Sequence, residues 1–445
     1  MEKNVVVIGG GPAGTTAAIS ARRYYPNASI KLIRQEEKAL IPCGIPYVVG
    51  TLGSLEKNLM PDTVFSKNNI ELIVDEVTSI NKEAKTVSTI THNTIGYDKL
   101  ALATGSSPLV PPLQGLDLDN VFVVKKEIKY LQKFLDALDR AKDVVVIGGG
   151  FIGLEFADEC KKKGIKNVTV IELLSRCLLL ACDEGICKRV EQKLKERDIN
   201  LLTNKKAESI LGTKKVEHVQ LKNGQKVKAD LVILGIGVIP SVELAEKAGL
   251  KIDKRAGIEV DGFMRTSDEN IFACGDCAKK TCYLSGMPVA IRLASVATTE
   301  ARIVGANLFS TRKKVECAIG IFSTCFGDLA IGSAGVTENR AKELNIDVLT
   351  SEITAPDKHP GDIPGVKELG VKLIFEKDTG LLIGGQVYGG SSVGELINFI
   401  GALIQHKMRA DEIATFQMGT HPMLTASPIV YQIVNAAEIA STRKC

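Results

Sequence analysis

Short runs of apolar residues alternate along the chain with longer segments of mixed character. Val5–Ile8 and Val144–Ile147 each consist of four β-branched residues, which is typical of a strand buried on both faces. A glycine-rich turn follows each run, and helical segments at about 13–24 and 153–163 follow the turns. Further strand patterns lie at 29–33, 70–74, 100–103, 168–171 and 231–234. This alternation predicts an α/β fold with two βαβ units.

Both glycine turns have the spacing G-x-G-x-x-G. Between a strand and a helix, this spacing directs unpaired backbone N–H groups toward a pyrophosphate, and the helix dipole favours the negative charge. Two such motifs in one chain imply two bound dinucleotides in Rossmann-like domains. The predicted contacts are Gly9, Gly11, Pro12, Ala13 and Gly14 in the first turn, and Gly148, Gly150, Phe151, Ile152 and Gly153 in the second.

The residue that ends the second strand of each unit indicates how a ribose is bound. Glu172 ends the strand 168–171, and a carboxylate there accepts a hydrogen bond from a ribose 2′-hydroxyl. No arginine follows immediately to hold a 2′-phosphate, so NADH is favoured and NADPH is the alternative. In the first unit Arg34 stands where an acidic residue is expected. Either Glu36 reaches that ribose or the contact is made differently.

Composition excludes several classes of partner. Charged residues are 24% of the 445 and the net charge is +4, so no nucleic acid partner is indicated. No apolar stretch reaches the ~18 residues that span a bilayer. Met1-Glu2-Lys3 leads directly into the first strand, and eleven cysteines without a secretory signal favour a reducing compartment, so we expect a cytoplasmic protein. Cys274, Cys277 and Cys282 are explained by a strand and turn, and no metal site is predicted.

The whole chain resembles the FAD/NAD(P)H disulfide reductases that bind two dinucleotides. The stretch Thr266–Asp276 is similar to their second flavin fingerprint, in which the aspartate binds the ribityl chain. Ala103-Thr104-Gly105 and Gly235–Pro240, which contains Gly237, are similar to their two inter-domain crossings. Glu155 lies where the family has a carboxylate near the nicotinamide. Val77 and Ala294 complete the predicted cofactor-binding set.

The resemblance implies FAD and NAD(P)H as cofactors and assigns the parts of the chain. It implies that residues 1–112 and 241–315 form the FAD-binding domain and that 113–240 form the NAD(P)H-binding domain. Residues 316–445 contain strand patterns and long apolar helices without a further dinucleotide motif. They resemble the family's C-terminal α+β dimerisation domain, which implies a homodimer whose active sites are completed by the partner subunit.

Cys43 is the predicted redox centre. Position 48, five residues on, is Val48, so the intramolecular disulfide of two-cysteine members cannot form there. The segment resembles the single-cysteine branch, which contains coenzyme A-disulfide reductases, NADH oxidases, NADH peroxidases and persulfide reductases. We expect Cys43 to open a helix, whose dipole would lower the pKa of the thiol. The thiolate would contact the flavin and form a mixed disulfide or a sulfenic acid.

Within that branch the electron acceptor stays open between three classes. Pro12 stands where oxidases and peroxidases carry a histidine, which favours a small disulfide, persulfide or polysulfide over oxygen or a small redox protein. Arg22 and Arg23 are candidates for coenzyme A phosphates or form a solvated helix end. Leu40-Ile41-Pro42 replaces the polar residues usual in coenzyme A-disulfide reductases.

The C-terminal segment offers two candidate acids. His421 precedes a proline, as does the family histidine that protonates the leaving thiol, although Ala426 replaces the glutamate that orients it. His359 also precedes a proline and is the second candidate.

Overall fold

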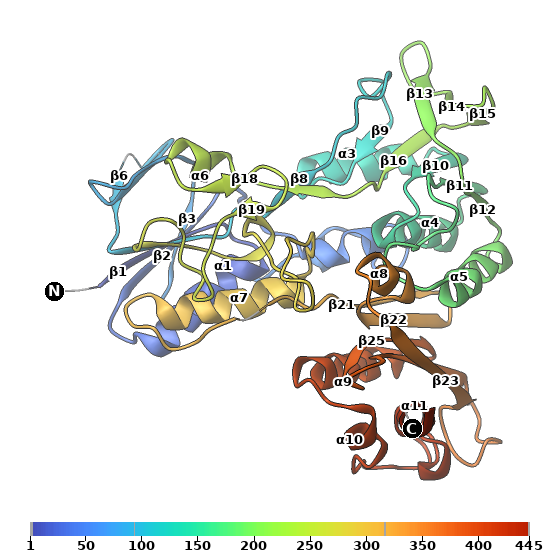
Figure 1. Ribbon diagram of the computed structural model, residues 1–445. Coiled ribbons are helices and arrows are strands. Elements are labelled where there is room, and N and C mark those ends of the chain that lie inside the picture. The colour runs from blue at the N-terminus through green and yellow to red at the C-terminus, as the bar shows by residue number, and fades with distance from the viewer. Residues whose placement is uncertain (1–2, 93, 316, 444–445) are drawn as a thin grey trace. The chain divides into compact units, whose positions relative to one another are not determined.

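The computed structural model describes residues 3–92, 94–315 and 317–443, which form two compact units (Figure 1). The first unit comprises residues 1–112, 122–140 and 236–318. The second comprises residues 113–121, 141–235 and 319–445. Because the chain leaves the first unit and later returns to it, segments far apart in sequence share one core. The four-part division of the chain remains a prediction.

The first unit is built on a parallel five-stranded sheet with the order β20-β7-β1-β2-β3. Its strands are β1 (Asn4–Ile8), β2 (Ser29–Arg34), β3 (Glu71–Val74), β7 (Lys99–Leu102) and β20 (Ile271–Ala273). Helices α1 (Pro12–Tyr24) and α7 (Ala294–Asn307) lie side by side. Gly305 allows their backbones to approach closely, since a Cβ at that position would be only 2.5 Å from the Cβ of Ser20.

Smaller elements complete the first unit. The chain adds one antiparallel sheet of three strands, two short strand pairs, three helices and four 3₁₀ turns. They are β4 (Val77–Asn81), β5 (Thr86–Thr89), β6 (Thr94–Gly96), β8 (Ser106–Pro108) with β17 (Val238–Pro240), β18 (Ile252–Asp253) with β19 (Gly257–Ile258), α2 (Thr63–Lys67), α3 (Ile128–Leu138), α6 (Glu243–Lys247), η1 (Pro42–Gly44), η2 (Pro46–Val48), η3 (Glu56–Asn58) and η4 (Gly275–Cys277).

The second unit contains four parallel strands in the order β12-β11-β10-β16, and β9 begins at Val121, the last residue of one of this unit's segments. A small antiparallel sheet, β13-β14-β15, follows it in sequence. The elements are β9 (Val121–Val123), β10 (Asp143–Ile147), α4 (Phe151–Lys163), β11 (Asn167–Ile171), α5 (Glu184–Glu196), β12 (Ile199–Leu202), β13 (Ala207–Leu211), β14 (His218–Leu221), β15 (Lys226–Lys228) and β16 (Leu231–Leu234).

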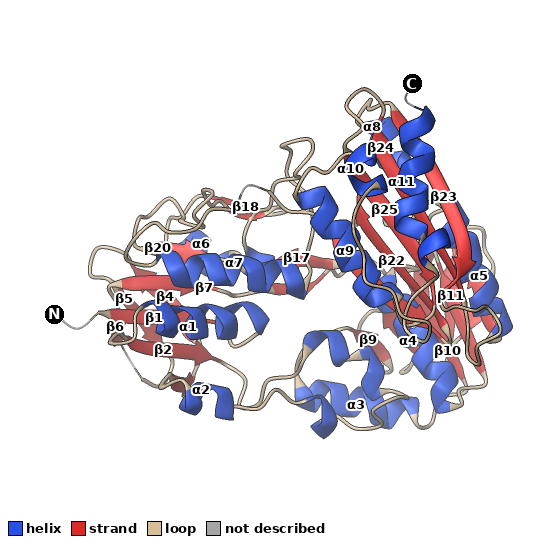
Figure 2. Ribbon diagram, turned by 90° about the horizontal axis from the view of Figure 1, so that it is seen from below, coloured by secondary structure: helices blue, strands red, loops and turns tan. Residues whose placement is uncertain are grey.

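The second unit also contains an antiparallel sheet with the order β21-β22-β25-β24-β23. Helix α9 packs on β22 and β25, and α11 packs on β23 and β24 (Figure 2). Helices α4 and α5 contact β21, so the two large sheets of this unit share packing. The elements are β21 (Ile321–Phe326), β22 (Leu329–Gly335), α8 (Glu338–Glu343), β23 (Val348–Pro356), β24 (Glu368–Glu376), β25 (Leu382–Gly389), α9 (Val393–Gln405), α10 (Ala410–Ala414), η5 (Pro428–Val430) and α11 (Gln432–Arg443).

The α/β fold and both βαβ units are confirmed. The helix expected to open at Cys43 is wrong, because η1 and η2 are separate three-residue 3₁₀ turns that each begin at a proline. Pro46 has no N–H to donate to the preceding turn, so an α-helix cannot run through this segment. A three-residue turn has no α-helical macrodipole, and a helix dipole therefore does not act on the Cys43 thiol.

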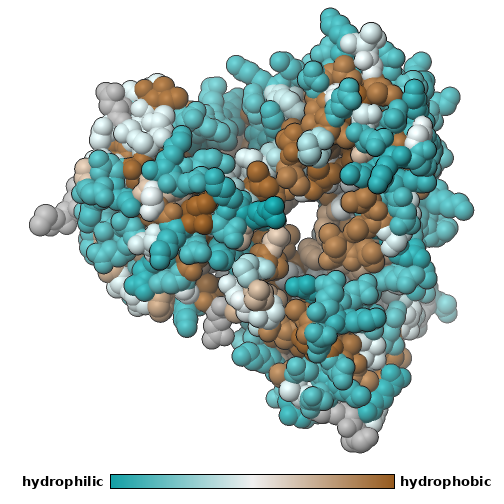
Figure 3. Space-filling view, turned by 45° about the horizontal axis from the view of Figure 1, so that its top comes forward, coloured by the Kyte–Doolittle hydropathy of each residue, from teal (hydrophilic) through white to brown (hydrophobic). Residues whose placement is uncertain are grey.

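Figure 3 shows hydrophilic residues over much of the surface, with hydrophobic residues gathered in patches of different sizes among them. Large apolar side chains near the C-terminal end are among the most exposed, with Leu424 at 72% and Ile429 at 83%. Across the described residues, every helix is too short or too polar to cross a lipid bilayer.

Candidate functional site

The first glycine turn joins β1 to α1 in the first unit. Gly9 has φ of +111°, a conformation that side chains disfavour, and a Cβ at Gly14 would be 1.9 Å from the carbonyl oxygen of Gly9. Gly14 therefore lets α1 pack closely against the end of the strand. A Cβ at Gly11, the N-cap of α1, would meet nothing within 4 Å among the described atoms. Pro12 and Ala13 begin the helix behind this open space, which fits a pyrophosphate.

The second glycine turn has the same geometry in the second unit. Gly148 has φ of +113°, and a Cβ at Gly153 would be 2.0 Å from the oxygen of Gly148. Gly150 is the N-cap of α4 and also faces open space among the described atoms. Phe151 and Ile152 form the first turn of the helix. The chain thus contains two cradles of the same design, one in each unit.

Glu172 lies beside the second turn and is 9% exposed. One carboxylate oxygen accepts the N–H of Gly149 at 2.6 Å, and the other accepts the N–H of Leu174 at 2.6 Å. These bonds fix the carboxylate at the edge of the cradle, where its remaining lone pairs can accept ribose hydroxyls. The next residue, Leu173, is 63% exposed and apolar.

Arg34 ends β2 at the equivalent place in the first unit, and its side chain is fully buried. The guanidinium binds both carboxylate oxygens of Asp62, at 2.6 and 2.7 Å, and donates to the backbone oxygens of Glu36 and Glu37. The aliphatic part lies against Gly10. Arg34 therefore shapes the wall of the first cradle and fixes the backbone of Glu36, while direct contacts of either residue with a cofactor stay predictions.

Asp276 follows β20 in the first unit, within η4. Its Oδ2 accepts a hydrogen bond of 2.8 Å from Ser106 Oγ, so the first crossing segment meets the second flavin fingerprint. The peptide groups of Gly275 are held by two buried charges: its N–H donates to Glu300 Oε2 at 2.8 Å, and its oxygen accepts from Lys280 Nζ at 2.6 Å. Glu300 and Lys280 are each 4% exposed. These contacts fix the position of Asp276.

The two predicted crossing segments pair with each other in the first unit as β8 and β17. Thr104 Oγ1 donates to the backbone oxygen of Ser241 at 2.8 Å, and the N–H of Ser241 donates to Gly105. Gly237 accepts the N–H of Leu109. Ala103, at the end of β7, is buried, and its oxygen would be 2.1 Å from a Cβ at Gly9, so this crossing adjoins the first cradle.

Arg292 provides a test of whether these residues fit a flavin dinucleotide. Its Nε is buried and has no hydrogen-bond partner among the described residues, although its Nη2 donates to Arg255. Burial lowers the pKa of Arg292, and the nearby charge of Asp276 opposes that shift. A buried donor that the protein leaves unpaired is costly, so it indicates an acceptor supplied by a bound molecule. Together with the two open cradles, the residues present fit FAD and a nicotinamide dinucleotide.

Two further predicted contacts lie at the ends of elements in the first unit. Ala294 is the first residue of α7, two positions after Arg292, and Val77 is the first residue of β4. Val77 packs against the core of the unit. Their contacts with a flavin stay predictions.

Cys43 is exposed at the surface of the first unit, within η1. Buried Asn58 holds the residues around it: its Nδ2 donates to the oxygen of Ile41 at 3.0 Å, and its backbone oxygen accepts the N–H of Ile41. A Cβ at Gly44 would be 1.9 Å from Asn58 Oδ1, so the glycine after the cysteine allows this close approach. The thiol is therefore accessible on a backbone that is firmly held.

Accessibility separates Cys43 and Cys325 from the other cysteines that the structure describes. Six of these ten cysteines are buried, two are intermediate, and Cys43 and Cys325 are exposed. Burial raises the pKa of Cys160 and of Cys187 to about 12, and desolvation also raises the pKa of the Cys325 thiol. Because the thiolate is the reactive form, these shifts make the three thiols poor nucleophiles. Cys445 lies outside the described residues.

The structure brings His359 and the loop of His421 together in the second unit. His359 Nδ1 lies 3.0 Å from the backbone oxygen of Thr425, and the backbone N–H of His359 donates to the backbone oxygen of Pro422. Nδ1 of His421 accepts the N–H of Met423 at 3.2 Å, and the side chain is exposed. In the neutral ring, this bond places the proton of His421 on Nε2. Cys43 lies in the first unit, and both histidines lie in the second.

Glu155 lies on α4, four residues after Phe151. Its Oε1 accepts a hydrogen bond of 2.7 Å from Thr324 Oγ1, on β21. Phe151 packs on Phe322 of the same strand, with ring centroids 4.4 Å apart. The sequence contains no signal for Thr324, Asn58 or Glu300, because nothing in their local pattern distinguishes them from ordinary strand, turn and helix residues.

Arg22 is engaged in the structure of the first unit. Its guanidinium donates to the backbone oxygens of four residues, Pro26, Ala28, Asn68 and Asn69, at 2.6 to 3.0 Å. These bonds tie the end of α1 to two loops and occupy most of its donors. Arg23 is exposed. The predicted phosphate contact therefore depends mainly on Arg23, and it stays a prediction.

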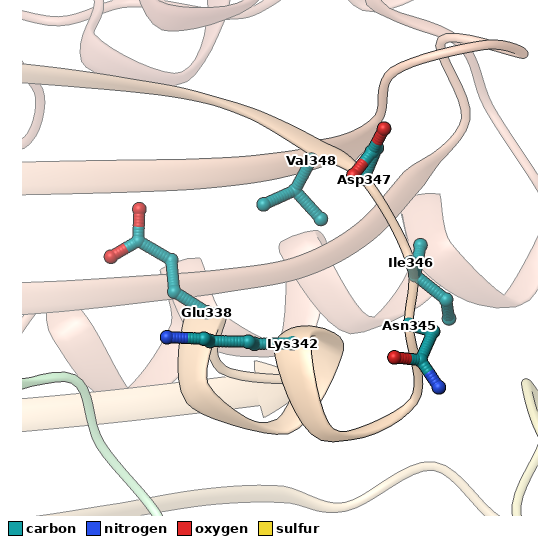
Figure 4. A pocket seen from close by; sticks show the side chains of 6 residues that line it. All are labelled: Glu338, Lys342, Asn345, Ile346, Asp347 and Val348. Atoms are coloured by element: carbon teal, nitrogen blue, oxygen red, sulfur yellow. The ribbon is translucent and has the colours of Figure 1, made fainter.

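One concavity of about 370 Å³ lies on the second unit, beside α8. Figure 4 shows the side chains that line it: Glu338, Lys342, Asn345, Ile346, Asp347 and Val348. None of them belongs to the predicted site, and Glu338 already binds Lys372 at 2.7 Å. Within the described part of the chain, no group of three or more His, Cys, Asp and Glu side chains is arranged to hold a metal ion.

Comparison with protein families agrees with this geometry. Residues 3–301 match the family described as pyridine nucleotide-disulphide oxidoreductase, and residues 321–429 match the dimerisation domain of that family.

Similar proteins have names from two activity classes. An NADH oxidase of Methanocaldococcus jannaschii is 33% identical over 423 residues, which is 93% of each chain. A CoA-dependent NAD(P)H sulfur oxidoreductase of Pyrococcus furiosus is 35% identical over 403 residues, 87% of this chain and 88% of that one. The solved structure of an NAD-dependent persulfide reductase from A. fulgidus superposes with a TM-score of 0.92 at 33% identity, covering 99% of this chain and 83% of that one.

Proposed function

Because the chain belongs to the pyridine nucleotide-disulphide oxidoreductase family, we propose that it uses NADH and FAD to reduce a small disulfide, persulfide or polysulfide through Cys43. The observation that carries this proposal is the accessible Cys43 thiol, held by Asn58, with Val48 where a second redox cysteine would stand. Because the segment around Cys43 contains a single cysteine, the thiol suits a substrate that supplies the second sulfur.

FAD, when bound, accepts a hydride from NADH and passes the electron pair to sulfur. The Cys43 thiolate attacks one sulfur of R–S–S–R′, which forms a Cys43–S–S–R mixed disulfide and releases R′S⁻. Reduction of the mixed disulfide by two electrons then returns the Cys43 thiolate and releases RS⁻. In the net reaction, NADH, one proton and R–S–S–R′ give NAD⁺, RSH and R′SH. The protein holds the thiol, orients the substrate and supplies the protons.

His421 is the proposed proton donor to the departing thiolate, and it would come from the partner subunit of a homodimer. Donation requires the imidazolium form of His421. Protonation of the ring gives up the contact of Nδ1 with the Met423 N–H, and the imidazolium then gives a proton to the thiolate and returns to neutral imidazole. His359 is the second candidate, but its Nδ1 faces the oxygen of Thr425. A histidine suits this role because its ordinary pKa lies near neutrality.

NADH is the proposed electron donor in preference to NADPH. The carboxylate of Glu172 is fixed beside the glycine turn and would repel a 2′-phosphate. The nearest arginine in sequence, Arg176, is paired with Glu184 and Glu191 at 2.9 and 2.7 Å. A cytoplasmic location fits a protein whose reactive thiol must stay reduced between turnovers.

Reduction of oxygen is the second candidate function. The NADH oxidase of M. jannaschii is similar over nearly the whole chain, and an exposed Cys43 could cycle through sulfenic acid. Pro12 occupies the position of the turn histidine found in that branch, which favours the sulfur substrate.

The test is anaerobic consumption of NADH or NADPH with coenzyme A disulfide and, separately, polysulfide, by the wild type and by Cys43→Ser. We expect fast anaerobic turnover, with NADH the better donor, and a loss of at least about 10³-fold in the variant, because serine cannot form the mixed disulfide. Cys325→Ser is the matched control, because it removes the other exposed thiol and should retain the wild-type rate.

Three other outcomes are informative. Turnover confined to aerated solution would make the protein an NADH oxidase. Reduction of a small redox protein at full rate by Cys43→Ser would make it a flavoprotein electron carrier. Preference for NADPH would contradict the role proposed for Glu172.

A further inference from the structure

Strand β21, the first strand of the C-terminal sheet, contacts the first turns of helix α4 within the second unit. Thr324 Oγ1 donates to Glu155 Oε1 at 2.7 Å, and Phe322 packs on Phe151 with an interplanar angle of 60°. Phe151 and Glu155 are four residues apart and share one face of α4. Phe322 and Thr324 are two residues apart and share one face of β21. Both contacts therefore belong to one strand-on-helix interface.

This interface reaches the residues that would surround a nicotinamide dinucleotide. Phe151 immediately follows Gly150, whose open side faces the predicted pyrophosphate position. Glu155 is one helical turn further on, and the family resemblance assigns its carboxylate to the nicotinamide end of the cofactor. The inference that follows rests on the proposed function of this second cradle.

Thr324 differs from its neighbours on β21 in a way that suits a fixed hydrogen bond. It is 7% exposed, whereas Ser323 and Cys325 on either side are exposed and lie on the opposite face of the strand. A β-branched side chain on a strand has few rotamers, so the hydroxyl is held in place before any ligand binds. A glutamate alone has three rotatable bonds, and a buried donor to its carboxylate restricts them.

We propose that Thr324 is a positioning residue for NADH: it holds Glu155 in the orientation that the nicotinamide requires. The strand that opens the dimerisation domain is then part of the NADH site. Because β21 belongs to the dimerisation domain, that domain would contact the residues that position NADH for reduction of the flavin.

Two variants separate the hydrogen bond from packing. Thr324→Val keeps the branched shape and removes the donor, whereas Thr324→Ser keeps the hydroxyl. Ser323→Ala is the matched control, because it removes an exposed hydroxyl one position away. Anaerobic stopped-flow absorbance at the flavin band gives the limiting rate of flavin reduction by NADH, and the dependence of the observed rate on NADH concentration gives the dissociation constant of NADH.

We expect Thr324→Val to lower the limiting rate by about tenfold and to weaken NADH binding by about fivefold, the range for loss of one hydrogen bond to a charged group. Thr324→Ser should recover both to within about twofold, and Ser323→Ala should match the wild type. Thermal unfolding midpoints and flavin content should be the same in all four proteins.

Two results would overturn the positioning role. A wild-type limiting rate in Thr324→Val would show that the hydrogen bond does not matter. A serine variant that loses as much as the valine variant would show that the hydroxyl alone does not restore the function of Thr324. Because the assay contains no sulfur acceptor, it distinguishes the two proposals: a flavin reduced by NADH in a protein that turns over no sulfur substrate contradicts the proposed function alone.

Discussion

Glu300 and Lys280 are buried charged residues on either side of the Gly275 peptide, and their environment differs from that of most ionisable groups in the chain. Burial raises the pKa of Glu300 to about 7, and the charge of Lys280 opposes this rise. The two side chains are 3.3 Å apart and each contacts Gly275, next to Asp276. At the scale of single residues, the backbone next to Asp276 is therefore held by a carboxyl group whose pKa burial raises to about 7.

The titration of Glu300 predicts a stability that falls with pH. Because its folded pKa is raised, the folded protein binds more protons than the unfolded chain between pH 4.5 and about 7. The corresponding stability is fully present below pH 4.5 and is lost as pH rises through 7. We expect the free energy of unfolding of wild type, relative to Glu300→Gln, to fall by up to about 3 kcal/mol between pH 5 and 8.

Urea unfolding of both proteins at several pH values measures this difference. Parallel pH dependences in the two proteins would mean that Glu300 does not titrate in this range. Glu259→Gln, at an exposed ion pair with Lys279, serves as a control that should show no such trend.

At the scale of elements, the two glycine turns show why one motif needs three glycines. In each turn the first glycine adopts a positive φ, the second leaves room in front of the helix, and the third allows the helix to touch the strand end. These requirements are local, and the sequence spacing predicted them correctly. The helix expected at Cys43 failed for an equally local reason, because Pro46 interrupts it.

Substitution of the second and third glycines of the second turn separates binding from folding. In Gly150→Ala the new Cβ occupies open space, so we expect stability within about 1 kcal/mol of wild type. The methyl group fills the pyrophosphate position, and NADH binding should weaken by at least about tenfold. In Gly153→Ala the Cβ would meet the oxygen of Gly148 at 2.0 Å, which should cost about 2 to 3 kcal/mol of stability.

Urea unfolding, and the dependence of the anaerobic flavin-reduction rate on NADH concentration in flavin-loaded protein, test this separation. The interpretation would be wrong if Gly150→Ala were as unstable as Gly153→Ala, or if it bound NADH as tightly as the wild type does.

At the scale of the whole molecule, exposed apolar residues near the C-terminal end point to an interface between subunits. Leu424 and Ile429 are 72% and 83% exposed, and both lie in the part of the chain that matches the dimerisation domain. Exposing large apolar side chains to water is unfavourable unless another surface covers them. His421 lies in the same segment, so the proposed acid and the proposed interface are neighbours in sequence.

We expect Ile429→Lys to weaken the dimer by introducing a charge into an apolar contact. Light scattering after gel filtration should show the mass falling from that of two 47.8 kDa chains toward that of one. The variant should keep its flavin and lose turnover of the sulfur substrate, because His421 would no longer reach a partner's thiol. Ile90→Lys changes an apolar residue that is 62% exposed in the first unit and should remain dimeric. A monomeric variant with full sulfur turnover would contradict the role of the partner subunit.

The sequence by itself determined the α/β fold class, the two dinucleotide cradles and the thiol, because each depends on local rules: apolar runs form buried strands, and glycine spacing sets a turn. The boundaries of α1 and α4 followed from the same patterns to within two residues. The sequence also singled out Arg34, because it ends a strand where an acidic residue is expected, but it did not predict that Arg34 would pair with Asp62.

Only the tertiary structure decided which side chains hold these features in place. Thr324 and Glu155 are separated by 169 residues, Ser106 and Asp276 by 170, and neither pair has a local pattern that links its members. Their contacts exist because packing of strands against helices brings distant backbones within hydrogen-bond range. Local sequence rules describe the energy of one segment, whereas these contacts depend on the energy of several segments packed together.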